Sequence, residues 1–438
     1  MAANPKVAPI SAKTFSASAI VLFLICLMYG ITYIDRNNVS TVASVFERDL
    51  HLTNTQIGFV YSAFAYPYLI FQIIGGWVSD RFGARIGLTV CGVIWASATL
   101  LTGTVSSLAA VIFLRVMLGF GEGATFPTAT RAMSDWTPKE KRGFAQGITH
   151  ASARLGNALT PPLVAWLIVA VTWRGSFIFL GIVSLAWVIA WALYFRDDPR
   201  DHPGITPLEL DHLPSYVARK NRETVPWLLL ARRMLPVTAV YFCYGWTLWL
   251  YLAWIPSFFL HSYRLNLKSS ALFSAGVFLA GVLGNTLGGV VSDRIFERTG
   301  DRNKARRNLV VAGFVCSLAS MLPILLLHNL TWVAVFLSLA FFFSEFTIGP
   351  MWAIPMDIAP RFSGSASGLM NTGSALAAIV SPLVFGYVID KTGNWTLPFL
   401  GSMGLLLIGA MMAFWMKPDE ELPGAALRAT LAPKEAKL

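Results

Sequence analysis

The heptapeptide Gly75–Arg81 reads Gly-Gly-Trp-Val-Ser-Asp-Arg, and it recurs 213 residues later as Gly-Gly-Val-Val-Ser-Asp-Arg at Gly288–Arg294. Six of the seven positions are identical. The first copy follows the second of twelve apolar stretches and the other copy follows the eighth, so the copies lie six stretches apart. Parallel repeats of this kind occur in membrane proteins built from two similar helical halves. The repeat therefore predicts two related bundles of six membrane-spanning helices.

The composition also indicates a membrane protein. Of the 438 residues, 55% are hydrophobic and 13% are charged, with a mean hydropathy of +0.60, whereas soluble domains carry about 25% charged residues. Each apolar stretch is close to the ~20 residues that a helix needs to cross a bilayer. We predict an all-α membrane protein with spans at 18–40, 56–79, 86–105, 108–130, 143–170, 175–195, 235–260, 270–292, 308–328, 331–356, 364–389 and 395–416.

The basic residues predict the topology. If both termini are cytoplasmic, the inner loops and tails hold 26 of the 34 lysines and arginines, and the outer loops hold 5. Such an excess of positive charge marks the cytoplasmic side of membrane proteins. The net charge of +11 is then a topology signal, and nucleic-acid binding is not expected. We predict a multi-pass plasma-membrane protein, of the bacterial inner-membrane type, with cytoplasmic termini.

The spans fall into two groups of six. The N-terminal bundle at 18–195 is separated from the C-terminal bundle at 235–416 by the segment 196–234, which is polar and contains five prolines. A segment of this composition is typical of a linker between domains. Residues 1–17 and 417–438 are predicted to be cytoplasmic tails.

The repeated heptapeptide has a plausible mechanical role. Its glycines let helices approach closely, and Asp80 can cap a neighbouring helix or bind an arginine. Such contacts would break and re-form as the halves move. The alternative is a tight turn with topological arginines, and two copies at matching positions favour the gating interpretation. The predicted gating residues are Gly76, Asp80, Arg81, Arg85, Asp293 and Arg294.

Charged side chains also lie within the spans, where they are costly unless they face a partner or a water-filled cavity. Asp35 and Arg36 are adjacent, so on a helix they point about 100° apart and cannot fully neutralise each other. The charges at the membrane centre are Asp35, Arg36, Arg115, Glu122, Arg154 and Glu345. They balance when all are ionised, and structural ion pairing remains an alternative for each of them.

The same charges suggest a transport mechanism. Burial favours the neutral form of a carboxylic acid, so the three central carboxylates, Asp35, Glu122 and Glu345, are candidate proton carriers near neutral pH. Protonation would leave the cavity positive and attract an anion, most naturally a carboxylate held by an arginine. Release of the anion would then favour release of the protons, which is proton-coupled symport.

An enzyme is not expected. The sequence contains no nucleotide-binding P-loop, no Ser-His-Asp arrangement and no zinc-ligand spacing. Its four cysteines all fall within spans, at spacings that fit neither a metal site nor a disulfide framework. We therefore expect no metal and no organic cofactor, with the proton gradient as the energy source, and a monomer in the lipid bilayer.

In its motifs the chain resembles the anion:cation symporter family of the major facilitator superfamily. That family includes bacterial galactonate, hexuronate, glucarate and tartrate transporters, sialin and the vesicular glutamate transporters. The matching segments extend over nearly the whole transmembrane region. They are 33–36, 64–76, 115–127, 247–256, and Trp352 with Asn371. The resemblance implies the twelve-helix major facilitator fold and alternating access.

The resemblance also implies roles for single residues. Arg36 and Tyr33 would hold the substrate carboxylate, while Asp35 and Glu122 would couple protons, with Arg115 tuning Glu122. Trp352 and Asn371 would contact the distal end of the substrate. The full set of predicted substrate-binding residues is Tyr33, Arg36, Tyr61, Arg115, Arg154, Trp352, Asn371 and Glu345.

Three departures from the family narrow the substrate. Sugar-acid members often carry an amide side chain near the position of Ala153, whereas the polar residue beside Ala153 in this chain is Arg154. Vesicular glutamate members carry a histidine at Tyr61 and an arginine at Tyr244. We therefore predict proton-coupled symport of a small organic anion, either a sugar acid or a dicarboxylate such as tartrate, an aldarate, hexuronate or galactonate. Of these, the departures disfavour galactonate, and they also disfavour vesicular glutamate transport. The alternatives are an aromatic carboxylate or inorganic phosphate as the transported anion, a non-transporting sensor, and an exporter of cations, which three intramembrane arginines disfavour.

Overall fold

The computed structural model describes residues 16–50, 54–216, 224–265 and 267–422, and within them the regular structure is entirely helical. The first bundle contains α1 (Ala17–Asp49), α2 (Asn54–Phe82), α3 (Ala84–Thr102), α4 (Leu108–Gly123), α5 (Thr125–Trp136) and α6 (Arg142–Tyr194). The second contains α8 (Trp227–Ser262), α9 (Leu267–Thr299), α10 (Leu309–Met321), α11 (Leu330–Phe346), α12 (Ile348–Ile358), α13 (Ser363–Thr392) and α14 (Leu397–Met412). The predicted all-α fold is confirmed.

Two predicted spans are broken near their middle, and prolines explain where. The fourth span divides into α4 and α5 at Ala124, and the tenth divides into α11 and α12 at Thr347. Pro127 and Pro350 are each the third residue after the break. Proline lacks the N–H group that would bond to the preceding turn, so it fits best in the first turn of a helix, although Pro67 and Pro355 lie inside helices.

Conversely, the fifth and sixth predicted spans both lie in α6. Thr172, with φ 69° and ψ 168°, interrupts the helix between them. Nine stretches of the described residues are long and apolar enough to cross a membrane. The predicted spans outside those nine are in α2, the first part of α6 and α13, which pack against the opposite bundle. The chain is a multi-pass membrane protein.

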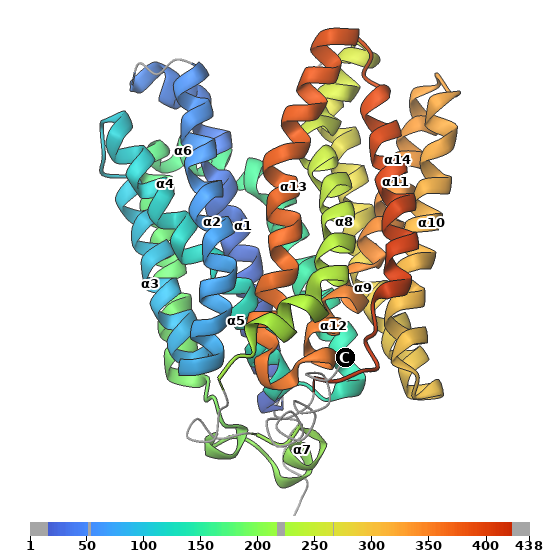
Figure 1. Ribbon diagram of the computed structural model, residues 1–438. Helices are drawn as coiled ribbons and strands as arrows, with labels where there is room; N and C mark the ends of the chain where they lie inside the picture. The colour runs from blue at the N-terminus through green and yellow to red at the C-terminus, as the bar shows by residue number, and fades with distance from the viewer. Residues whose placement is uncertain (1–15, 51–53, 217–223, 266, 423–438) are drawn as a thin grey trace, which may run out of the picture.

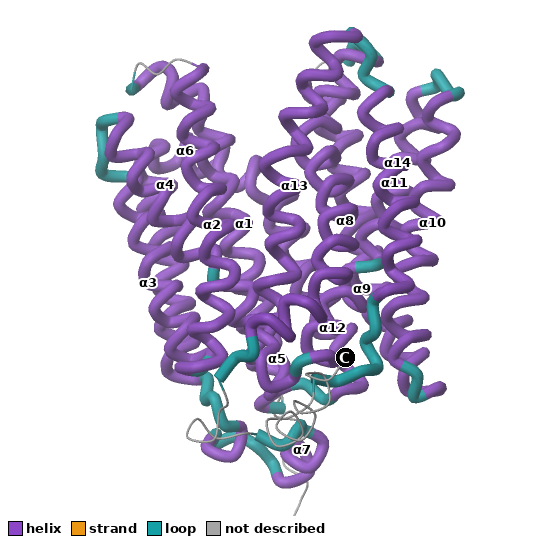
Figure 2. The backbone as a smooth tube through the Cα atoms, in the orientation of Figure 1, coloured by secondary structure: helices purple, strands orange, loops and turns teal. Residues whose placement is uncertain are grey.

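The two bundles lie side by side, and the segment with α7 (Pro207–His212) connects them at one end, here called the linker side (Figure 1). The ribbons of the bundles converge on the linker side and diverge toward the opposite end (Figures 1 and 2). Contacts between bundles join α2 to α13 and α6 to α9, with α5 and α12 completing the interface. The interface is therefore closed on the linker side.

Glycines make this close approach possible. A Cβ atom on Gly76 of α2 would collide with the carbonyl oxygen of Gly364 on α13. A Cβ atom on Gly289 of α9 would likewise collide with the carbonyl oxygen of Gly143 on α6. The repeated heptapeptide thus supplies one such glycine to each of the two inter-bundle contacts.

The linker is attached to the first bundle by acidic side chains. The backbone N–H of Ser18 donates a 2.7 Å hydrogen bond to Oε1 of Glu209, which caps the start of α1. Partial burial raises the pKa of Glu209, but the hydrogen bonds from Ser18 outweigh it and hold this pKa below its usual value. Because the ionised form is the one that caps, the attachment is present at neutral pH and is lost as the pH falls through the lowered pKa.

We predict that Gly76→Ala prevents full closure on the linker side, because the added Cβ has only backbone as its neighbour. Overpacking of this kind costs about 1–3 kcal/mol, so the melting temperature of the purified protein should fall. Gly276→Ala is the matched control, since a Cβ there meets nothing within 4 Å. An equal thermal shift for the two variants would contradict the assigned close approach.

Candidate functional site at the centre and on the linker side

The first bundle holds an arginine–glutamate pair at its centre. Arg36 of α1 approaches Oε2 of Glu122 on α4 through Nε at 2.9 Å and Nη2 at 2.8 Å. Glu122 is fully buried, and Oε1 of its carboxylate accepts no hydrogen bond from the described residues. The guanidinium carbon lies 4.7–5.8 Å from the ring centres of Tyr33, Phe64, Tyr68 and Phe126. Cation–π contacts therefore fix the position of this charge.

Asp35 faces a different direction from its neighbour Arg36. Oδ2 of Asp35 accepts a 2.6 Å hydrogen bond from the hydroxyl of Ser184 on α6. The carboxylate is 1% exposed and lies inside the first bundle. Adjacent positions on α1 thus direct one charge toward Glu122 and the other toward α6, as the helical angle between them requires.

Arg115 of α4 contacts the backbone next to the Arg36–Glu122 pair. It donates hydrogen bonds to the carbonyl oxygens of Val60 and Arg36, both at 3.3 Å. Its guanidinium carbon lies 5.2 Å from the ring centre of Phe64. The two arginines therefore share one aromatic side chain, and Glu122 lies within electrostatic reach of both.

A second arginine–glutamate pair joins the two bundles. Arg154 of α6 donates to both carboxylate oxygens of Glu345 on α11, with Nε–Oε2 at 3.2 Å and Nη2–Oε1 at 3.3 Å. Arg154 also donates to the hydroxyls of Tyr33 at 3.4 Å and Tyr244 at 3.3 Å. The hydroxyl of Tyr244 donates to Glu345 at 2.7 Å, and Asn285 of α9 donates at 2.8 Å. The pair is buried, and its guanidinium belongs to one bundle and its carboxylate to the other.

The other predicted contact residues flank this pair. Trp352 of α12 donates from Nε1 to the hydroxyl of Tyr241 at 2.7 Å and packs against His150 with ring centres 4.8 Å apart. Asn371 of α13 donates to Oε1 of Gln72 on α2 at 2.8 Å, which also joins the bundles. The side chain of Tyr61 lies outside the part of the chain that the structure describes.

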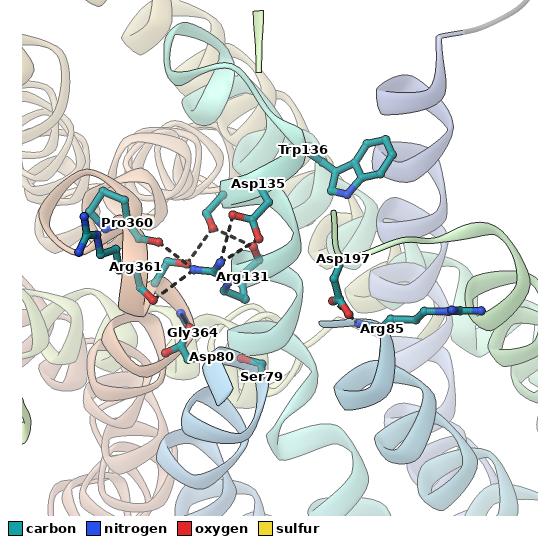
Figure 3. A network of polar contacts seen from close by, with 12 residues as sticks. Ser79, Asp80, Arg85, Arg131, Asp135, Trp136, Asp197, Pro360, Arg361 and Gly364 are labelled. Atoms are coloured by element: carbon teal, nitrogen blue, oxygen red, sulfur yellow. Dashed lines mark hydrogen bonds and ion pairs between the residues drawn. The ribbon is translucent and has the colours of Figure 1, made fainter. Parts of the chain in front are cut away.

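On the linker side, the first repeated aspartate caps a helix of the other bundle (Figure 3). Asp80 accepts hydrogen bonds from the backbone N–H groups of Gly364 at 3.1 Å and Ser365 at 2.7 Å, and from the Ser365 hydroxyl at 2.6 Å. These groups belong to the first turn of α13, where N–H groups have no partner within the helix. Nearby, Arg131 of α5 donates to the carbonyl oxygen of Pro360 at 2.9 Å.

The second repeated aspartate does the same in the opposite direction. Asp293 of α9 accepts from the backbone N–H groups of Gly143 at 3.0 Å and Phe144 at 2.6 Å, in the first turn of α6. Arg306 contacts Asp293 at 3.0 Å and Asp357 at 3.1 Å. Each bundle therefore caps one helix of the other, and we call these two contacts the helix-cap latches.

The remaining gating candidates lie outside the latches. Arg81 and Arg294 are exposed. Arg81 lines a cavity of about 1140 Å³ between the linker and the ends of the bundles. Arg85 donates to the carbonyl oxygen of Ala192 at 2.9 and 2.6 Å, which satisfies the end of α6 within its own bundle. The structure brings Gly76, Asp80 and Asp293 to the inter-bundle contacts and leaves these three arginines apart from them.

Several residues of the site were missed by the sequence reasoning. Arg142 and Arg306 lie at or just beyond the ends of predicted spans, among the basic residues that indicate the topology, and Asp357 follows the end of the tenth predicted span. All three are buried, and both arginines form ion pairs with Asp357. The sequence did contain a signal for two other residues of the site, Gln72 and Asn285. Asn285 precedes Asp293 by the same spacing with which Gln72 precedes Asp80.

A second overlooked repeat concerns the two glutamates. Glu122 is followed by Pro127, and Glu345 is followed at the same spacing by Pro350. Each glutamate is one residue from the end of its half-helix, before the break that the proline explains. Glu122 and Glu345 therefore occupy equivalent places in the two bundles.

Two helical bundles with a charged centre between them and breakable contacts at one end are the architecture of a transporter that works by alternating access. Comparison with known proteins agrees. The chain belongs to the major facilitator superfamily, whose family model matches residues 25–382 and 300–436. Of its solved relatives, the crystal structure of the superfamily transporter FucP in the outward conformation gives a TM-score of 0.69 at 14% identity, covering 92% of this chain and 99% of that one.

Curated relatives extend over nearly the whole chain. A probable sulfoacetate transporter of Cupriavidus necator is 46% identical over 402 residues, covering 91% of this chain and 93% of the relative. The hexuronate transporter of Bacillus subtilis is 27% identical, with coverages of 91% and 94%. A probable galactarate/D-glucarate transporter of Escherichia coli is 28% identical, with coverages of 93% and 96%. The family resemblance seen in the motifs is confirmed, and the chain is a transporter and not an enzyme.

We predict that Asp80→Asn weakens the first latch, because a neutral amide is a weaker acceptor for the N–H groups at the start of α13. A hydrogen bond to a charged acceptor is roughly twice as strong as a neutral one, and because removing a cap altogether costs about 0.5–2 kcal/mol, the amide should lose a part of that. A cysteine introduced at Ser363, buried beside Ser134, should therefore react faster with a membrane-impermeant thiol reagent applied from the linker side. Asp211→Asn, on the exposed face of the linker, is the control and should leave the labelling rate unchanged. Equal rates in both variants would show that Asp80 does not hold the bundles together.

Proposed function

We propose that the protein imports a small organic anion with protons, and that its preferred substrates carry two acidic groups. The observation that carries the proposal is the pair of guanidinium groups beside Tyr33. Arg36 and Arg154 lie with their guanidinium carbons 4.8 and 5.7 Å from the centre of that ring. Arginine is well suited to carboxylate and sulfonate oxygens, because it offers two parallel N–H donors.

The names of the relatives support this class of substrate. Sulfoacetate, hexuronate, galactarate and glucarate are all organic acids. Galactarate and glucarate carry two carboxylates, sulfoacetate carries a sulfonate and a carboxylate on one methylene carbon, and hexuronate carries a single carboxylate. Arg36 would take one acidic group, with the hydroxyl of Tyr33 beside it. Arg154 would take the other. Trp352 and Asn371 would contact the remainder of the substrate from the second bundle.

The contacts of Glu122 support proton coupling. When a substrate anion binds Arg36, it competes with Glu122 for the same guanidinium. A buried carboxylate that loses its counter-charge is unstable unless it takes up a proton. Substrate binding and protonation of Glu122 would then favour each other, which is the thermodynamic requirement for symport. We assign Asp35, one residue along α1, as a second proton carrier within the first bundle.

The orientation follows from the distribution of basic residues. The linker side would be cytoplasmic, which makes the closed end described above the cytoplasmic one and places both termini there. We propose a monomer in the plasma membrane, of the bacterial inner-membrane type. The proton gradient would supply the energy, without a metal or an organic cofactor.

Uptake by proteoliposomes tests the proposal. We expect uptake of labelled sulfoacetate to rise several-fold with an inward proton gradient. Glu122→Gln should abolish this dependence while counterflow partly persists, because exchange of bound substrate needs no net proton movement. Glu297→Gln, at an exposed glutamate of α9, is the matched control. Gradient-driven uptake that is unchanged in Glu122→Gln would rule out the coupling role.

A further inference from the structure

Glu345 occupies Arg154 in the way that a bound anion would. Both oxygens of its carboxylate accept from the guanidinium, at 3.2 and 3.3 Å. Arg154 is 3% exposed and Glu345 is fully buried. The protein therefore carries an internal carboxylate at the arginine that distinguishes this chain from the sugar-acid pattern.

The equivalent glutamate of the first bundle has a different kind of partner. Glu122 on α4 is paired with Arg36 of α1, the first helix of its own bundle. Glu345 on α11 receives only the hydroxyl of Tyr244 from α8, the first helix of its own bundle. Its guanidinium comes from α6 across the interface. The first pair can thus persist while the bundles move relative to each other, whereas the second must deform or break.

Breaking the second pair would leave a buried charge that needs a new partner. Leaving a buried guanidinium without a counter-charge is strongly destabilising. Glu345 itself would keep two hydrogen bonds after separation, from Tyr244 of its own bundle at 2.7 Å and from Asn285 of its own bundle at 2.8 Å. Among the residues of its own bundle that the structure describes, Arg154 would keep one hydrogen-bond partner, the hydroxyl of Tyr33. The arginine is therefore the member of the pair that requires a replacement anion.

We propose that Glu345 is a built-in counter-anion, which the second acidic group of a dianionic substrate displaces from Arg154. This rests on the proposed function and adds the reason for its selectivity. A monoanion bound at Arg36 leaves the Arg154–Glu345 pair intact, so the bundles stay joined at their centre. A dianion satisfies both arginines and releases the second bundle to move.

The direction in which one substitution changes the affinity for sulfoacetate separates this role from an ordinary positioning role. If Glu345 competes with the substrate, Glu345→Gln should raise the affinity for sulfoacetate, by about tenfold for 1.4 kcal/mol of lost competition. If Glu345 merely holds Arg154 in place, the same substitution should lower that affinity. Isothermal titration of the purified full-length chain with sulfoacetate, and with acetate as the monoanion, measures the difference.

Two further variants complete the experiment. Arg154→Gln should bind sulfoacetate no more tightly than acetate, because the second acidic group loses its partner. Glu345→Asp keeps the charge but shortens the side chain, so it weakens the pair with Arg154 and should raise sulfoacetate affinity less than Glu345→Gln does. It tests the same direction if Glu345→Gln does not fold, and a fall in affinity would overturn the proposal.

The outcomes also separate this inference from the proposed function. A wild-type protein that binds no sulfoacetate would refute the proposed dianion substrate and the counter-anion role together. A wild-type protein that binds and transports sulfoacetate, while Glu345→Gln binds it equally or more weakly, would overturn the counter-anion role alone. Transport by Glu345→Gln should slow despite the tighter binding, because release of the substrate then leaves Arg154 without an anion.

Discussion

A guanidinium buried in or between two helical bundles needs a nearby negative charge. The organisation of this transporter depends on which bundle supplies that charge. Arg36 finds Glu122 within its own bundle, and Arg154 finds Glu345 in the opposite one. In the membrane interior neither charge can turn to bulk water, so every rearrangement must exchange one partner for another. A substrate that supplies negative charge is such a partner. In the proposed mechanism, anion recognition and movement of the bundles are then aspects of a single exchange of ion pairs.

The linker side solves a related problem with backbone groups. The first N–H groups of α6 and α13 lack partners inside their helices, and Asp293 and Asp80 supply them from the opposite bundle. Glycines at the crossing points allow the backbones to approach closely enough. These caps are buried while the interface is closed, and in the proposed mechanism water would replace them when the bundles separate. We propose that the latches hold the interface closed and are weak enough to open during transport.

Sequence reasoning recovered the helices better than the partners. The repeated heptapeptide and the apolar stretches predicted two six-helix bundles, because hydrophobic length and repeat position are properties of the chain itself. The angle between Asp35 and Arg36 was also predictable, since α-helical geometry fixes it. The pairing of Arg142 and Arg306 with Asp357 was not, because loop charges and latch charges look alike until distant segments are brought together.

The sequence by itself determined the membrane class, the two related halves and the identity of the charges at the centre. Only the tertiary structure decided that Arg154 and Glu345, 191 residues apart, share one ion pair across the interface while Arg36 and Glu122 share one within a bundle. The physical reason is that a charge within an apolar stretch is costly whatever its partner is, so each such charge can be recognised from the sequence alone. Which two charges form a pair depends on how the helices pack, and that packing is known only once the whole chain has folded.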